Sequence, residues 1–177
     1  FLAGLNEGDH AVISQLAKKI TAQAKTPLEK LHAIFEYVQK NVRYVYAHLG
    51  RGGLTPHSPA WTLKNGFGDC KDQTALLTAL LNEVGVVAHP ALYDTSEVYI
   101  VKDAPRLMFD HMIVYVPQQD GISSTFVDSS NYKLQFPGIN AKNDTAKALV
   151  LGKQWGKFVN INQGENTNTL DIVTDYT

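Results

Sequence analysis

The chain has 177 residues and a formal net charge of −1, with its 16 lysines and arginines scattered along the sequence. This charge pattern argues against a nucleic-acid-binding protein, which would need a basic face. No apolar run is long enough to span a membrane, and a single cysteine excludes an internal disulfide. The length suits one ordinary domain with a hydrophobic core of its own.

Two helices are predicted near the start of the chain. Apolar residues recur at helical spacing after Asp9 and continue to Ile20. The sequence TPLE, residues 26–29, is a strong helix start, because it combines a threonine cap, a proline at the first helical position and a glutamate three residues after the cap. The second helix should fade near Asn41, where VRYVY predicts a short extended segment.

Residues 50–68, GRGGLTPHSPAWTLKNGFG, predict a long irregular loop that is rich in glycine and proline. Its apolar residues favour an ordered loop, and loops of this length in compact domains are usually functional or disordered. Asp69 then caps a third helix that runs roughly from Cys70 to Val84. Gly85 is a natural residue to end it.

The chain after this helix is predicted to form a sheet. Short β-rich runs follow one another, separated by proline, aspartate, glycine and asparagine. A polar stretch from Asn160 should add one or two more strands. Helices first and strands afterwards predict an α+β domain with a mainly antiparallel sheet. The predicted strands lie in VVAHPALY (86–93), SEVYIV (96–101), HMIVYV (111–116), STFVD (124–128) and YKLQF (132–136).

Cys70 is the only cysteine and is predicted to lie in the first turn of a helix. Free amide N–H groups and the helix dipole favour negative charge there, and the thiolate is the form that attacks a carbonyl carbon. The same N–H groups could help to stabilise the resulting oxyanion. Gly66 and Gly68 are expected to keep the approach to the thiol clear and to let the backbone turn tightly.

Cys70 would need a histidine as its base, and the chain has six. Hairpin geometry favours His111 over the other five. HMIVYV and STFVD are joined by PQQDGIS, in which Asp-Gly predicts a hairpin turn. A turn centred between residues 119 and 120 places His111 opposite Asp128, whereas a turn centred on residues 120 and 121 makes the two diagonal neighbours on one face. Asp128 can orient a ring nitrogen of His111 in both registers.

These three residues suggest a catalytic triad, although each also has a simpler explanation. A lone cysteine is often a buried inert thiol, His111 could bond a backbone carbonyl at a strand end, and Asp128 stands in good turn sequence. Taken together they predict a nucleophile in Cys70, a general base and acid in His111, and an orienting carboxylate in Asp128.

The same residues resemble the transglutaminase-like core of the papain-like superfamily, particularly its bacterial members. The matching segments are VRYVY, the loop leading into GDCKDQT, FDHMIVYV and FVDSSN, and the resemblance runs from about Leu28 to Leu134. It implies a cysteine-bearing helix packed on an antiparallel sheet. It also implies that the cysteine forms a thioester with the acyl group of an amide, and that this acyl group is then transferred to an amine or to water. The resemblance further suggests a periplasmic or secreted location.

The residue that binds the oxyanion is left open by this resemblance. Papain-like proteases place a glutamine shortly before the cysteine, and this sequence has none there. Transglutaminase-like proteins often use an aromatic donor instead, so Tyr44 and Trp61 are both candidates. Trp61 is otherwise a core residue or, as we favour, part of the acyl-binding cleft. Lys71 is expected to be solvated.

The predicted function is therefore cysteine-dependent acyl transfer on protein or peptide amides, to water or to an amine. The alternative is a catalytically idle peptide-binding or scaffolding module of a larger protein. Residues 1–177 are expected to form a single transglutaminase-like domain with its core at about residues 28–135. Because Phe1 is not an initiator methionine, the chain is expected to be a processed form or an excised piece with neighbouring domains.

No cofactor or metal ion is predicted. The sequence carries no HExxH, no paired CxxC and no calcium-loop pattern. Asp69 and Asp72 could suggest a metal site, but a helix cap and a first-turn carboxylate explain both.

Overall fold

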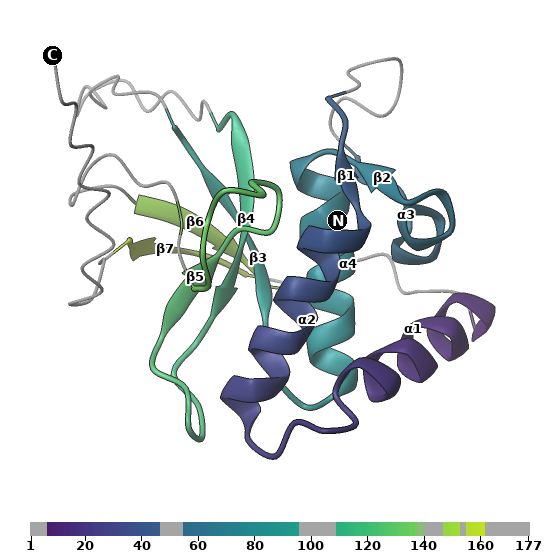
Figure 1. The fold of residues 1–177 in the computed structure, drawn as a ribbon. Coiled ribbons are helices and arrows are strands. Elements are labelled where there is room, and N and C mark those ends of the chain that lie inside the picture. The colour runs from purple at the N-terminus through teal and green to yellow at the C-terminus, as the bar shows by residue number, and fades with distance from the viewer. Residues whose placement is uncertain are drawn as a thin grey trace, which may run out of the picture.

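Helices precede the sheet along the chain, and they pack against one face of it (Figure 1). The computed structural model describes residues 7–46, 55–95, 109–137, 139, 147–152 and 155–161. In this part of the chain there are four helices, a five-stranded antiparallel sheet and a separate two-stranded ribbon. The predicted α+β class is confirmed.

The N-terminal helices follow the local signals of the sequence. Helix α1 spans Glu7–Ile20, and α2 spans Pro27–Asn41. The capping box before α2 is present, because the Thr26 hydroxyl accepts from the backbone N–H of Glu29, and the Glu29 carboxylate accepts from the backbone N–H of Thr26. The apolar face of α2 is buried against the third long helix, α4, which spans Cys70–Glu83.

The predicted loop over residues 50–68 is wrong in its second half, where helix α3 spans Pro59–Asn65. Ser58 caps this helix by accepting from the backbone N–H of Trp61, and Pro59 is its first residue. Serine followed by proline is itself a helix start signal, and the glycines around it masked that signal. Residues 50–54 lie outside the described residues.

A short parallel ribbon connects the end of α2 to the start of α4. Strand β1, Arg43–Tyr44, pairs with β2, Phe67–Gly68. The extended VRYVY segment is thus present as a strand of two residues. The ribbon places Tyr44 next to Gly68, two residues before Cys70.

The main sheet has the order β5-β4-β3-β6-β7, and every neighbouring pair is antiparallel. Strands β3, β4 and β5 belong to the predicted set, and β4 has the predicted bounds. The strands are β3 (His89–Tyr93), β4 (His111–Val116), β5 (Thr125–Val127), β6 (Lys147–Leu151) and β7 (Gly156–Asn160).

Two predictions about the strands need correction. YKLQF is not a strand, because residues 131–137 form turns whose carbonyls at Asn131 and Leu134 accept from the Gln39 side chain of α2. The β6–β7 hairpin was not predicted. The predicted strand at 96–101 and the tail beyond residue 161 lie outside the described residues.

Apolar residues are buried on both faces of the sheet. The larger cluster joins α1, α2 and α4 to the inward side chains of β4 and β5, such as Val114 and Val127. The second cluster lies on the other face and includes Ile113, Phe126 and Val150. Burial on both faces fixes the register of the strands, since a slip of one residue would exchange the two sets.

Candidate active site

Helix α4 begins at Cys70, as predicted, and Asp69 caps it. The Asp69 carboxylate accepts from the backbone N–H groups of Lys71 and Asp72, and the Asp72 carboxylate accepts from the backbone N–H of Asp69. This reciprocal capping box fixes the first turn of the helix. Cys70 itself is partly exposed.

The surroundings of this turn differ from expectation in one respect. Lys71 is not solvated: it is only 6 % exposed, and its ammonium group pairs with the Asp69 carboxylate. Gly68 is needed for close packing, because a Cβ atom there would lie 2.6 Å from the Cβ of Asp72. Gly66 takes up the left-handed conformation, with a φ of 67°, that ends α3. Both glycines therefore shape the backbone before the helix.

His111 and Asp128 are brought together by the second of the two predicted registers. Strands β4 and β5 pair Val114 with Val127, and the turn is centred on residues 120 and 121. This register places Asp128 diagonal to His111 on the same face of the sheet. His111 Nε2 lies 2.8 Å from Asp128 Oδ2.

Asp128 is 5 % exposed and has a partner for each carboxylate oxygen. Oδ2 faces His111, and Oδ1 accepts from the backbone N–H and the hydroxyl of Ser130 at 2.9 and 2.6 Å. Burial raises the pKa of Asp128, but the hydrogen bond and charge of His111 and the bonds from Ser130 outweigh it and hold the pKa below its ordinary value. Asp128 is therefore a carboxylate at neutral pH.

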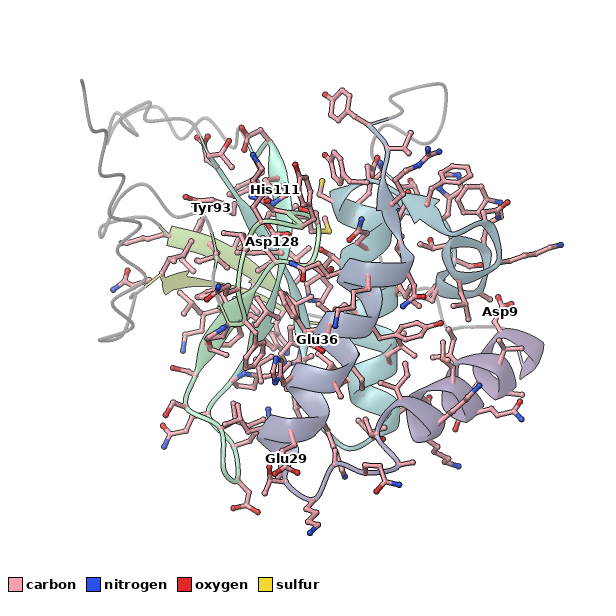
Figure 2. All side chains as sticks on the ribbon, viewed as in Figure 1. Asp9, Glu29, Glu36, Tyr93, His111 and Asp128 are labelled. Carbon is pink, nitrogen blue, oxygen red and sulfur yellow. The ribbon has the colours of Figure 1, made fainter. Side chains whose placement is uncertain are left out.

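His111 lies between this carboxylate and the thiol. Its Nε2 faces Asp128, so the other ring nitrogen, Nδ1, is left for the hydrogen bond with Cys70. Burial lowers the pKa of His111, but hydrogen bonds with Asp128 and Cys70 and the charges of both groups raise it to about 10. Figure 2 shows His111 and Asp128 together at the end of the sheet beside α4, far from Glu29 on α2.

Two buried polar residues of α4 attach the cysteine-bearing helix to the segments that carry the other two groups. The Thr74 hydroxyl donates to the backbone carbonyl of Met112 at 3.0 Å, next to His111. Gln73 accepts from the Ser129 hydroxyl at 3.3 Å and donates to the carbonyl of Val42 at 3.2 Å. Neither residue was predicted from the sequence. The sequence pattern that could have identified them is a polar residue next to the apolar face of a predicted helix.

A cavity of about 660 Å³ opens beside this group, and Tyr44 lies on its wall with His111 and Asp128. Burial and the negative charge of nearby groups, Cys70 first, raise the pKa of Tyr44 to about 12. Its hydroxyl therefore keeps its proton and can donate a hydrogen bond. The other lining residues are Arg43, Tyr93, Thr95, Ile113, Ser130, Asn131, Tyr132 and Ile139.

Trp61 is the other candidate for the oxyanion site. It lines neither this cavity nor a smaller cavity that adjoins it at the end of α2. Its ring stacks on His57, with centroids 3.8 Å apart, and meets Phe67 edge-on. His57 in turn contacts the Asp72 carboxylate through its backbone N–H at 2.8 Å and through its ring. Trp61 thus packs against His57, which in turn holds the Asp72 side chain at the start of α4.

Comparison with known proteins assigns the family. The family model of the transglutaminase-like superfamily matches residues 14–103, which is more than half of the chain. The chain belongs to the transglutaminase-like superfamily. The match includes Cys70 but ends before His111 and Asp128, so the grouping of these three residues comes from the structure rather than from the family match. No curated protein matches the sequence.

Solved structures give this member of the transglutaminase-like superfamily a known fold. A "putative protease" from Parabacteroides distasonis superposes with a TM-score of 0.66 at 17 % identity, over 87 % of this chain and 28 % of that one. A "putative cysteine protease" from Cytophaga hutchinsonii gives 0.49 at 20 % identity, over 70 % and 38 %. Legionella pneumophila LapG gives 0.49 at 19 % identity, over 70 % and 74 %. The chain spans less than a third of the length of the Parabacteroides protein.

Neither a metal site nor a membrane-spanning helix is found within the described residues of this superfamily member. No three histidine, cysteine, aspartate or glutamate side chains gather there in a way that could hold a metal ion. No described helix is long and apolar enough to cross a membrane.

Proposed function

We propose that this chain is the catalytic domain of a cysteine-dependent acyl-transfer enzyme acting on protein or peptide amides. The observation that carries the proposal is the position of His111, whose Nε2 lies 2.8 Å from Asp128 Oδ2 and whose pKa is raised by its interactions with Asp128 and Cys70. Membership of the transglutaminase-like superfamily and the name of the Parabacteroides relative support the same chemistry.

In the first half-reaction Cys70 attacks the carbonyl carbon of the amide as the thiolate, while His111 holds the proton. The C–S bond forms while the carbonyl π electrons move to oxygen, and the oxyanion is stabilised by donors such as the Tyr44 hydroxyl. His111, which is cationic at neutral pH because its pKa is about 10, gives its proton to the leaving amine. The C–N bond then breaks, and a thioester on Cys70 remains.

In the second half-reaction a water molecule or a primary amine attacks the thioester. His111, now neutral, takes the proton of the attacking group, and the thiolate leaves. Asp128 keeps the imidazole oriented and stabilises its cation in both halves. Hydrolysis makes the chain a protease or amidase, and transfer to an amine makes it a transglutaminase.

An electrophilic probe tests the proposal directly, because the chain has a single cysteine. A peptidyl vinyl sulfone or acyloxymethyl ketone should add one equivalent to the wild-type protein and none to Cys70→Ala. His111→Ala should react much more slowly. Denatured casein, incubated with and without a dansylated amine, should then show either new cleavage products or incorporated label. A probe that labels His111→Ala as fast as the wild type would contradict the triad and favour a binding module.

A further inference from the structure

Two cavities adjoin at the candidate active site and share part of their walls. The larger, of about 660 Å³, contains His111 and Asp128, and the smaller, of about 340 Å³, extends along the end of α2. Together we call them the groove, and their combined volume exceeds that of a single side chain. The residues common to both are Arg43, Tyr44, Ser130 and Tyr132.

Arg43 is the charged residue at the junction of the two cavities. Its backbone N–H donates to the carbonyl of Gly66 at 2.9 Å, which fixes its place in β1, and the residue is exposed. None of the ion pairs in the described part of the chain includes Arg43. Its guanidinium group therefore presents a positive charge with five donors and no carboxylate partner.

The other charged groups along the groove leave this charge uncompensated. Asp128 is the carboxylate on these walls, and both of its oxygens are engaged by His111 and Ser130. Lys40, on the smaller cavity, is already paired with Glu36 at 3.1 Å. Among the described residues of the groove, Arg43 is thus the cation that is free to meet a group on a bound molecule.

We propose that Arg43 is a specificity-determining residue, which selects peptides with a carboxylate close to the scissile amide. This inference rests on the proposed function and names its substrate class. Guanidinium groups bind carboxylates in a fixed, two-pronged geometry that an ammonium cannot reproduce. Two sources of the carboxylate share this chemistry: an aspartate or glutamate side chain, and the C-terminus of the peptide.

The position of the carboxylate follows from the β1–β2 ribbon. Tyr44 pairs with Gly68 and lies beside the reacting groups, and Arg43 is the preceding residue of the same strand, paired with Phe67. An extended peptide advances by about 3.3 Å per residue. We therefore expect the carboxylate within about two residues of the scissile bond, on the side toward Arg43.

A peptide array tests this specificity without requiring turnover. Immobilised decapeptides are prepared in matched pairs that differ only by glutamate or glutamine at one position, and each is made with a free or an amidated C-terminus. The array is probed with Cys70→Ala and with Cys70→Ala/Arg43→Gln. The first protein should bind glutamate peptides about fivefold better than their glutamine partners. The second should show no difference.

Further variants make the result specific to the guanidinium group. Arg43→Lys should restore part of the preference, and Arg43→Glu should reverse it, so that the glutamine peptides bind better than their glutamate partners. Lys18→Gln is the control that removes a positive charge elsewhere, and it should change nothing, because Lys18 is an exposed residue of α1 that lines neither cavity. A preference that depends on a free C-terminus alone identifies the terminal carboxylate as the ligand. A preference that survives amidation identifies a side chain.

Equal binding of glutamate and glutamine peptides by Cys70→Ala, or a preference unchanged by Arg43→Gln, would overturn the inference. This holds whether or not the wild type proves to be active. Conversely, an Arg43-dependent preference in a protein whose Cys70 fails to react with the electrophilic probe would support the inference and contradict the proposed catalysis. The two failures are therefore distinguishable.

Discussion

His111 and Asp128 lie at the ends of adjacent antiparallel strands, with 2.8 Å between Nε2 and Oδ2. The pair is diagonal rather than directly opposite, so the imidazole reaches across the hairpin to the carboxylate. This arrangement leaves Nδ1 free to face the start of α4. The geometry of one hairpin thus decides which ring nitrogen meets the carboxylate.

Replacing Asp128 with asparagine should impair catalysis without unfolding the protein. The amide keeps the shape but removes the charge that raises the pKa of His111. We expect kcat to fall about a hundredfold or more, as for other triads that lose their acid. The pKa of His111, followed by NMR of its ring protons, should fall at the same time. Asp120→Asn, in the exposed hairpin turn, serves as the control and should leave both quantities unchanged.

The stability of the protein should depend on pH through His111. Its pKa is raised to about 10 in the folded state, against an ordinary value of about 6.5 in the unfolded chain. The folded state therefore holds a proton more tightly, and this contribution is full below pH about 6.5 and is lost as the pH rises toward about 10. Urea unfolding of the wild type and of His111→Gln should show the wild type losing stability relative to the variant across this window. Parallel curves would contradict the raised pKa.

The Tyr44 hydroxyl should contribute to the chemical step. We expect Tyr44→Phe to lower kcat by about tenfold or more while KM changes little, because an oxyanion donor acts on the transition state. Steady-state kinetics on a peptide found in the casein experiment would measure both. Tyr132→Phe is a matched control on the same cavity wall, where the residue is 78 % exposed. If kcat of Tyr44→Phe equals that of the wild type, the oxyanion is bound by other groups.

Two buried threonines of α4 should respond oppositely to replacement by valine. The Thr74 hydroxyl bonds the Met112 carbonyl, so Thr74→Val should lower the free energy of unfolding by about 1–2 kcal/mol and slow catalysis through the displaced strand. The Thr78 hydroxyl is buried and has no hydrogen-bond partner among the described residues, so Thr78→Val should leave stability unchanged or raise it. Chemical denaturation measures the free energy of unfolding of the two variants, and steady-state kinetics measures their kcat. Equal losses in the two variants would mean that valine is tolerated poorly by the core in general.

Much of the fold could be predicted because its signals are local. The capping box at TPLE and the cap at Asp69 depend on residues within one helical turn, and both are present. The Asp-Gly turn restricted the hairpin to two registers, and either one leaves Asp128 within reach of His111. Sequence patterns fail where contacts with distant residues outweigh the local preference for helix or strand. YKLQF has good strand-forming residues, yet Gln39 of α2 holds its backbone in turns.

The sequence by itself determined which groups we propose for the chemistry: one cysteine at a helix start, and one histidine and one aspartate on a hairpin. Only the tertiary structure decided how they meet. Bonds from Gln73 and Thr74 to segments 30 or more residues away set the helix against the sheet. The tertiary structure also placed Tyr44 on the cavity wall and turned Trp61 toward His57. Contacts between distant segments leave no periodic pattern in a single sequence, because each depends on how whole elements pack.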